Sequence, residues 1–486
     1  MLFNSTHFAL FLPVVFLLYW FVTNRNLKLQ NALLLIASYF FYACWDWRFL
    51  FLLIFSTLLD FYTGIKMTEA KNKKIKKSWF WLSVLVNLGF LGVFKYYNFF
   101  AASLAASVAH IGVEINPWTL KVILPVGISF YTFHGLSYII DIYKNKINAE
   151  RNYIDYAVFV SFFPLLVAGP IERATHLLPQ IKNKRTFDYN NAVAGLKQIL
   201  WGLFKKVVIA DQCATMANMI FNNSADYAGS SLFIGSFFFA FQIYGDFSGY
   251  SDIAVGTAKL FGIDLLKNFA YPYFSRDIAE FWRRWHISLS SWFRDYLYIP
   301  LGGSKGGTWM KIRNTFIIFL VSGFWHGANW TFIAWGFLNA LYILPSIIFK
   351  TNRNFIETVA TNKILPSFKE SFLMLKTFGL TIFAWIFFRS ESIGNALDFV
   401  SRMFGGIDNI DNYTKTYLLI RQLENVFWIA FLFFIITEWL GRTKSFAIEH
   451  LSYIFPRWII WGVYYLIIAL LLYFGNSHQS YIYFQF

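Results

Sequence analysis

Long apolar runs recur along this chain of 486 residues, and they restrict its fold more than any other feature. A helix needs about 20 apolar residues to cross the hydrocarbon core of a bilayer, and helices satisfy their own backbone hydrogen bonds there. Hydrophobic residues make up 57% of the chain and charged residues 14%, against about 25% charged in soluble domains. The sequence therefore predicts an all-α polytopic membrane protein with about 10–12 transmembrane helices.

The net charge of +16 is concentrated in short segments between the apolar runs. The strongest cluster is KMTEAKNKKIKK, with six lysines in residues 66–77. Cytoplasmic loops of membrane proteins are rich in Lys and Arg, so we expect this loop inside the cell. Alternation of the spans then places the N-terminus and the C-terminal segment 476–486 outside. This distribution of charge argues against binding of nucleic acid.

The segments that we expect to form spans or broken spans are long, apolar and flanked by polar loops. They are residues 7–23, 29–44, 47–65, 79–108, 120–143, 191–221, 231–262, 314–326 with 328–349, 370–388, 425–441 and 457–474. We expect the first to be a retained span, because no basic segment precedes it and no cleavage site follows it. A tight CWDW corner at 44–47 separates the second from the third.

Two further segments are expected at the membrane without crossing it. Residues 156–173 are short and interrupted by prolines and a glycine, which is typical of a re-entrant segment covered by protein. Residues 274–299 are basic and aromatic along their whole length, so we expect them at the inner face. We expect a mixed loop at 389–424. The whole chain is predicted to be one membrane domain, with a catalytic core at about 120–350 and peripheral helices at 1–110 and 370–474.

His326 lies in the sequence GFWHGANW, inside an apolar stretch. An ionisable side chain at membrane depth is costly and marks a functional site by default. Flanking glycines permit a helix break there, and tryptophans, including Trp325 and Trp330, surround the histidine. A neutral imidazole in this setting can act as a general base. The alternative is a structural histidine bonded to a neighbouring helix.

His286 lies in FWRRWHISLSSW. If this run is one helix, Trp282, His286, Leu289 and Ser290 share a face. The alternative is an interfacial helix whose arginines, such as Arg283, meet lipid headgroups while its tryptophans form an aromatic belt.

A polar stripe follows the segment 231–262. It comprises Gln242, Asp246, Ser248, Tyr250, Ser251 and Asp252. Two interpretations stay open. The acids either hold helices together by bonding arginines such as Arg276 or Arg283, or they line a channel. His134, on the apolar span 120–143, is interpreted as a satisfied core residue.

Several enzyme motifs are missing from the sequence. It contains no GxSxG, Walker, GxGxxG or HExxH pattern. Two well-separated histidines also make no metal site, because metal ligation needs several converging ligands. We therefore expect acid–base chemistry and no metal or bound cofactor.

Eight blocks in order give the chain a specific resemblance to the membrane-bound O-acyltransferase family, in particular to bacterial members that acetylate exported polysaccharides. The blocks are LFNSTHFALFLPVVFLLYW (2–20), LPVGISFYTFHGLSYIIDIY (124–143), FFPLLVAGPIER (162–173), LWGLFKKVVIAD (200–211), QIYGDFSGYSDIAVG (242–256), FSRDIAEFWRRWHISLSSWFRDYLYIPLGG (274–303), FWHGANWTFIAWG (324–336) and AWIFFRS (384–390).

The resemblance implies that His326 is the catalytic histidine and that His286 stands at a second, less uniform polar position. It also implies re-entrant and interfacial helices around a central tunnel. An acyl thioester such as acetyl-CoA would enter this tunnel from the cytoplasm as co-substrate, and a hydroxyl acceptor would approach from outside. His326 would deprotonate that hydroxyl, while His286 would orient the thioester or steady the oxyanion.

On this basis we expect further residues to shape the tunnel and its inner mouth. They are Gln242, Asp246, Tyr250, Trp282, Ser290, Trp325 and Trp330 in the tunnel, with Arg283, Arg284 and Arg294 attracting the phosphates of the donor.

The predicted partners are membrane lipid, an extracytoplasmic transferase and a polysaccharide. The predicted location is the bacterial inner membrane. Three alternative functions remain open, namely D-alanyl transfer to teichoic acid, acetylation of peptidoglycan and proton-coupled transport.

Overall fold

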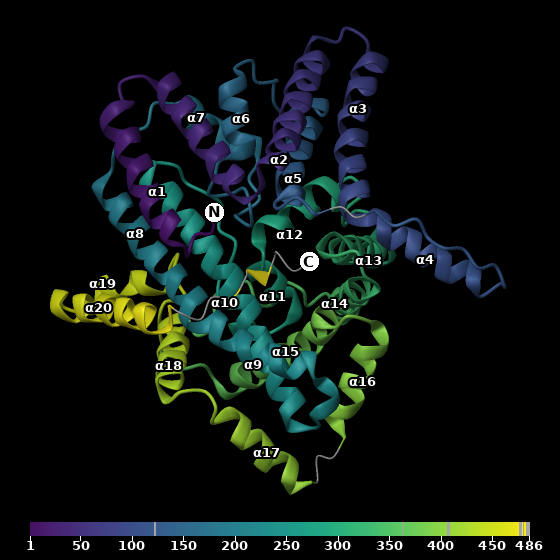
Figure 1. The fold of residues 1–486 in the computed structure, drawn as a ribbon, viewed down its shortest axis with the longest axis vertical. Coiled ribbons are helices and arrows are strands. Elements are labelled where there is room, and N and C mark those ends of the chain that lie inside the picture. The colour runs from purple at the N-terminus through teal and green to yellow at the C-terminus, as the bar shows by residue number, and fades with distance from the viewer. Residues whose placement is uncertain (121–122, 362, 406–408, 476–478, 480, 483–486) are drawn as a thin grey trace. The chain divides into compact units, whose positions relative to one another are not determined.

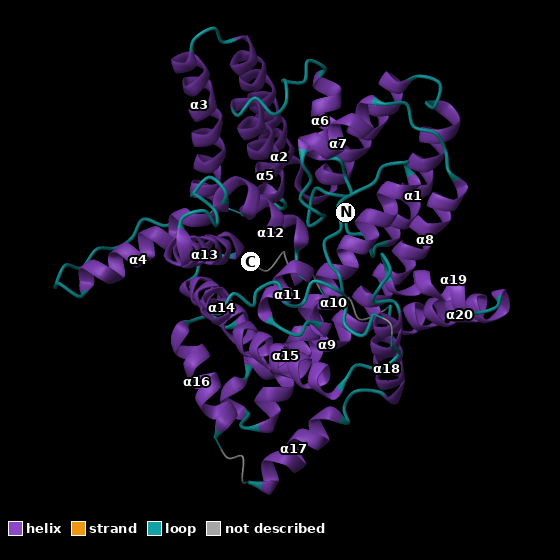
Figure 2. Cartoon of the chain, turned by 180° about the vertical axis from the view of Figure 1, so that it is seen from behind, coloured by secondary structure: helices purple, strands orange, loops and turns teal. Residues whose placement is uncertain are grey.

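The computed structural model describes residues 1–120, 123–361, 363–405, 409–475, 479 and 481–482. The described residues contain helices and loops and no strand (Figure 2). The α-helices are α1 (Thr6–Leu17), α2 (Leu27–Glu69), α3 (Lys73–Leu91), α4 (Tyr97–Ala109), α5 (Ile128–Tyr143), α6 (Tyr153–Ser161), α7 (Ala174–Lys182), α8 (Tyr189–Leu203), α9 (Asp211–Asn222), α10 (Ser230–Leu260), α11 (Ile278–Arg284), α12 (Ile287–Phe293), α13 (Gly307–His326), α14 (Trp330–Ile348), α15 (Phe368–Arg389), α16 (Ile393–Phe404), α17 (Ile410–Ile420), α18 (Asn425–Leu440), α19 (Leu451–Ile454) and α20 (Arg457–Phe474) (Figure 1). The predicted all-helical fold is confirmed.

The chain divides into two compact units. Unit 1 comprises residues 1–193 and 257–266, and unit 2 comprises 194–256 and 267–486. The predicted single domain with its core at 120–350 stays a prediction.

Helices α2, α3 and α5 pack against one another in unit 1 (Figure 1). Helix α2 is bent at Asp46, whose φ of −155° and ψ of 111° are not helical. The bend confirms the corner predicted at 44–47. Five residues of π-helix, Gly92–Tyr96, join α3 to α4. The helical segment Lys73–Ala109 is long and apolar enough to cross a membrane, in agreement with the span expected at 79–108.

The segment at 156–173 is irregular and covered by protein. Helix α6 ends at Ser161, α7 begins at Ala174, and residues 162–173 between them are non-helical and buried. This arrangement is the one expected for interrupted backbone at membrane depth, because its polar groups need protein partners.

Backbone groups of the segment 156–173 also contact His134 of α5. The backbone N–H of Glu172 donates to Nε2 of His134 at 3.1 Å, and Nδ1 lies 3.5 Å from the carbonyl oxygen of Val160. The interpretation of His134 as a satisfied core residue is confirmed.

Among the described residues, five helical segments are long and apolar enough to cross a membrane. They are Leu27–Glu69, Lys73–Ala109, Trp330–Ile348, Phe368–Arg389 and Arg457–Phe474. The pair Ile410–Ile420 and Asn425–Leu440, bent by 90°, would add a sixth. Our expectation of about 10–12 spans also counted shorter helices, such as α5 with 16 residues. That number stays a prediction.

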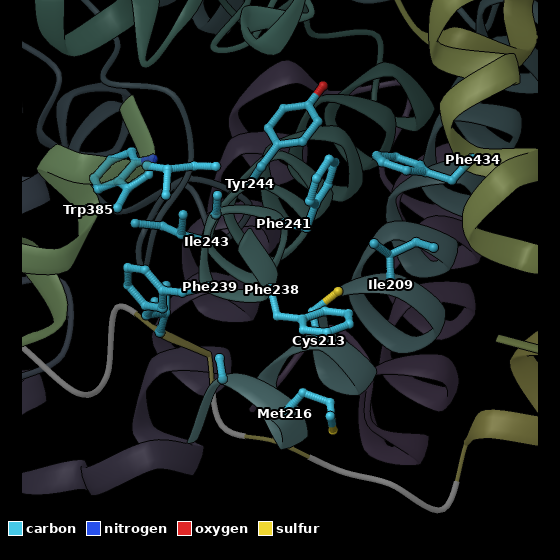
Figure 3. Packing of buried hydrophobic residues seen from close by; sticks show 14 of the residues in the cluster. Ile209, Cys213, Met216, Phe238, Phe239, Phe241, Ile243, Tyr244, Trp385 and Phe434 are labelled. Carbon is cyan, nitrogen blue, oxygen red and sulfur yellow. The ribbon is translucent and has the colours of Figure 1, made fainter. Parts of the chain in front are cut away.

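An aromatic core fills unit 2. Figure 3 shows part of this core, with labelled side chains from α10, α15 and α18. The Phe434 ring of α18 lies 6.4 Å from Phe241 and 6.2 Å from Tyr244, both of α10. The expected mixed loop at 389–424 contains two helices, α16 and α17. The expectation that segment 476–486 lies outside the cell falls mainly on residues outside the described ones.

Candidate active site

His326 is the last residue of α13, and a tight hairpin places it there. A Cβ built at Gly323 would lie 2.2 Å from the carbonyl oxygen of Phe332 on α14, and one built at Gly336 would lie 2.2 Å from that of Phe319. Only glycine permits this approach of the two helices. The Asn329 side chain then accepts a hydrogen bond from the Thr331 backbone at 3.0 Å and caps α14. The helix break predicted beside His326 is confirmed.

Three aromatic rings from three helices surround the His326 imidazole, which is half-buried. Its ring centroid lies 4.7 Å from Trp325, 5.2 Å from Trp335 of α14 and 5.3 Å from Phe388 of α15. Apolar walls of this kind disfavour a charged imidazole and favour the neutral form that can accept a proton.

His286 lies at a break between α11 and α12, so the single helix considered from the sequence is wrong. Helix α11 ends at Arg284 and α12 begins at Ile287. His286 itself has a φ of 43° and a ψ of 54°, in the left-handed region that non-glycine residues rarely adopt. Trp282 and His286 therefore do not share one helix face. Strained residues of this kind often occur at functional sites.

The His286 side chain is buried, with 1% of its surface exposed. Its Nδ1 lies 3.0 Å from Oδ1 of Asn268, and the Phe247 ring packs against it at 4.6 Å. Its Nε2 is buried and has no hydrogen-bond partner among the described residues. Burial lowers the pKa of this imidazole, which lies outside the segments that can span a membrane, so the ring is neutral at pH 7. Asn268 was missed from the sequence, because one asparagine in a short loop carries no pattern.

Trp325 brings the two histidines together. Its ring centroid lies 6.1 Å from that of His286 and 4.7 Å from that of His326. Residues 40 positions apart in the sequence thus share one aromatic neighbour, and the two imidazoles form one candidate site.

A cavity of about 510 Å³ lies in unit 2 beside this site. Trp282, Arg283 and Ser290, all predicted from the sequence, line it. Its described lining includes neither histidine. Trp282 links the cavity to His326, because its ring lies 5.7 Å from Trp335, which itself contacts His326.

The charge of the cavity comes from basic residues. Arg283, Lys350 and Arg353 are exposed, and Lys311 of α13 is half-buried. Arg284 and Arg294 do not line the cavity. Arg284 is buried and paired with Glu280 at 2.9 Å, and Arg294 is paired with Asp295 at 2.8 Å. The sequence therefore identified one of the cavity's basic residues and missed the others, because these come together only when α13 packs against α14.

The polar stripe on α10 forms buried ion pairs with lysines. Lys206 Nζ lies 2.5 Å from Asp246, and Lys205 Nζ lies 2.6 Å from Asp252. The partners predicted from the sequence, Arg276 and Arg283, are wrong. Arg276 pairs with Glu280 at 3.1 Å and with Glu370 at 3.2 Å. The acids therefore join the helical segment before Asp211 to α10.

The other candidates have different surroundings. Tyr250 is buried, with its ring 5.4 Å from Tyr481. Gln242 is also buried, and its Oε1 has no hydrogen-bond partner among the described residues. Trp330, at the start of α14, is 56% exposed. A tunnel-lining role for these three residues and for Asp246 stays a prediction.

Comparison with known proteins gives this arrangement a context. The profile of MBOAT, the membrane-bound O-acyltransferase family, matches residues 144–383. A probable alginate O-acetylase of Azotobacter vinelandii is 39% identical over 88% of this chain and 82% of its own length. The corresponding protein of Pseudomonas aeruginosa is 40% identical over 83% of this chain and 75% of its own length.

A peptidoglycan O-acetyltransferase of Helicobacter pylori is 36% identical over 83% of this chain and 80% of its own length. Identity at this level over most of both chains accompanies a shared fold and a shared reaction class. With its apolar helices, the chain is a multi-pass membrane protein. It belongs to the membrane-bound O-acyltransferase family and is an O-acyltransferase.

Proposed function

We propose that the protein transfers an acetyl group from a cytoplasmic thioester, most simply acetyl-CoA, to hydroxyl groups of an exported polysaccharide of the alginate type. The observation that carries the proposal is a basic cavity whose wall is joined to His326 by packed aromatic rings. Basic side chains line the cavity together with Trp282, and Trp282 contacts Trp335, which contacts the imidazole. Basic residues attract the phosphates of a nucleotide-linked donor, and apolar walls suit its acyl end.

In this proposal His326 is the general base. Its neutral imidazole accepts the proton of the acceptor hydroxyl as the oxygen attacks the thioester carbonyl carbon. The new carbon–oxygen bond forms, the carbon–sulfur bond breaks, and the imidazolium returns the proton to the departing thiolate. His286, which shares Trp325 with His326, orients the thioester or steadies the developing oxyanion.

The direction of transfer is part of the proposal. We expect the lysine-rich segment 66–77 on the cytoplasmic side, and we propose that the donor enters from within the bacterial cell. The acceptor approaches from the outer side of the inner membrane, where a separate extracytoplasmic transferase passes the acetyl group to the polymer. Neither a bound cofactor nor a metal takes part.

A second candidate acceptor is peptidoglycan. The Helicobacter pylori relative with that name covers as much of this chain as the Pseudomonas aeruginosa relative does, at 36% against 40% identity. The same site would serve, with a different partner and polymer.

The test uses membrane vesicles that contain the protein and acetyl-CoA labelled in the acetyl group. We expect the label on extracytoplasmic polysaccharide, and none when His326 is replaced by alanine. Digestion of the labelled polymer with alginate lyase or with a muramidase separates the two acceptors. Label that enters no polymer or acceptor molecule in vesicles with intact protein would refute the proposed reaction.

A further inference from the structure

The Asn268 side chain lies at the centre of a buried polar cluster around His286. Its Oδ1 lies 3.0 Å from His286 Nδ1 and accepts a hydrogen bond from Ser288 Oγ at 2.9 Å. Its Nδ2 donates to Ser251 Oγ of α10 at 3.1 Å. All four residues are at most 4% exposed. In this arrangement the amide oxygen faces His286 and the amide nitrogen faces α10.

The backbone holds the same two segments together. The Ile287 N–H donates to the Asn268 carbonyl oxygen at 2.9 Å, and the Ala270 N–H donates to that of Arg284 at 3.0 Å. These bonds lie on either side of His286 and stabilise its left-handed conformation. Residues 268–270 thus position both the backbone and the ring of His286.

The contact with Asn268 determines the tautomer of the imidazole. An amide oxygen only accepts hydrogen bonds, so with Oδ1 of Asn268 facing it, Nδ1 carries the proton. In a neutral imidazole Nε2 is then an acceptor with a free lone pair. This atom is buried without a partner among the described residues. A buried polar atom normally has a partner, which indicates that a bound molecule supplies the donor.

We propose that Asn268 is a positioning residue that holds His286 in the Nδ1–H tautomer, so that Nε2 accepts a hydrogen bond from an O–H or N–H group of a bound substrate. This inference rests on the proposed function and narrows it. A neutral ring with its only N–H on Asn268 has no proton to offer an oxyanion. Of the two roles considered for His286, orientation of a substrate remains.

The first measurement is independent of activity. Solid-state ¹⁵N spectra of the histidine-labelled protein in lipid, with His286→Gln used to assign the signal, report which ring nitrogen carries the proton. We expect protonated Nδ1 in the wild type and in Asn268→Asp, because a carboxylate also only accepts. We expect a mixture of tautomers in Asn268→Ala. Protonated Nε2 in the wild type would overturn the inference, even if acetyl transfer proceeds as proposed.

The second measurement is transfer per folded molecule. Asn268→Ala should lower kcat/KM about tenfold, the effect of one hydrogen bond. Asn268→Asp should recover most of this loss, and its activity should fall at a higher pH as the solution is acidified, because the carboxylate raises the pKa of His286. Asn314→Ala is the control, since the Asn314 amide donates to the Gly303 carbonyl and is also buried. It should lower the yield of folded protein without moving the pH profile. An Asn268→Asp variant that folds but is as inactive as Asn268→Ala would contradict the proposed tautomer.

If wild-type vesicles transfer no acetyl group, the proposed function fails while the spectra still test the tautomer. If transfer occurs and Asn268→Ala matches the wild type, only the inference about Asn268 fails.

Discussion

His134 and His286 are equally buried, with 1% of each side chain exposed, yet their surroundings differ in one respect. Both ring nitrogens of His134 face backbone groups of unit 1, the Glu172 N–H and the Val160 carbonyl. His286 uses only Nδ1, and its Nε2 has no partner among the described residues. Both residues also lie near broken helices. The comparison teaches that burial beside irregular backbone does not by itself identify a functional histidine, and that the unsatisfied nitrogen is what distinguishes His286 from His134.

His326 completes the comparison, because it joins His286 through Trp325 while His134 belongs to a different unit. The largest effect is therefore expected from His326→Ala. Loss of a positioned general base should reduce transfer by about 10²–10⁴-fold, with the same amount of folded protein in the membrane. The check is labelled acetyl transfer, normalised to folded protein by size-exclusion chromatography in detergent. Activity within twofold of the wild type would show that His326 is not the general base.

The second-largest effect is expected from a change in the α13–α14 hairpin, which places His326. Gly323→Ala should destabilise the protein by about 1–3 kcal/mol, because the new methyl group meets the Phe332 carbonyl oxygen and helices α13 and α14 must separate. The midpoint of thermal unfolding in detergent measures this. Gly379→Ala on α15 is the matched control, since a Cβ there has no neighbour within 4 Å, and its midpoint should not fall. Equal midpoints for the two variants would mean that the hairpin is not closely packed.

The comparison of the two buried histidines predicts opposite defects. His134→Ala leaves the Glu172 N–H unsatisfied and should lower stability by about 1–3 kcal/mol, with kcat per folded molecule unchanged. His286→Ala should lower kcat/KM about tenfold through the lost substrate hydrogen bond. Unfolding curves and kinetics on the same preparations separate the two. A loss of catalysis in folded His134→Ala would show that an unsatisfied nitrogen is not the distinguishing feature.

The smallest effect concerns the basic cavity. Arg353→Ala should raise KM for acetyl-CoA about threefold to tenfold, and added salt should reduce the difference from the wild type, because the interaction is electrostatic. Arg294→Ala is the control, since Arg294 pairs with Asp295 and does not line the cavity. A higher KM in Arg294→Ala with no change in Arg353→Ala would contradict binding of the donor at this cavity. It would indicate binding near Arg294, as predicted from the sequence.

Local sequence patterns were sufficient to predict several structural elements. Apolar length predicted the helical membrane fold, and the CWDW corner matches the bend at Asp46. The glycines around His326 predicted its helix break, which α13 and α14 confirm. These features depend on residues that are near in sequence, where helix length, glycine and proline act directly on the backbone.

Contacts between segments far apart in the chain could not be predicted from such local patterns. One of the two interpretations of the polar stripe paired its acids with arginines, whereas Lys206 pairs with Asp246. A single helix through residues 281–292 would place Trp282 and His286 on one face, whereas the chain turns at His286.

The sequence by itself determined the class of fold, the resemblance to the family and the two histidines. Only the tertiary structure decided that Trp325 lies between those histidines, that α13 and α14 bring Lys311, Lys350 and Arg353 to one cavity, and that Asn268 holds the His286 ring. The physical reason is that an ion pair or a hydrogen bond depends on the distance between two side chains. For segments far apart in the chain, helix packing sets that distance.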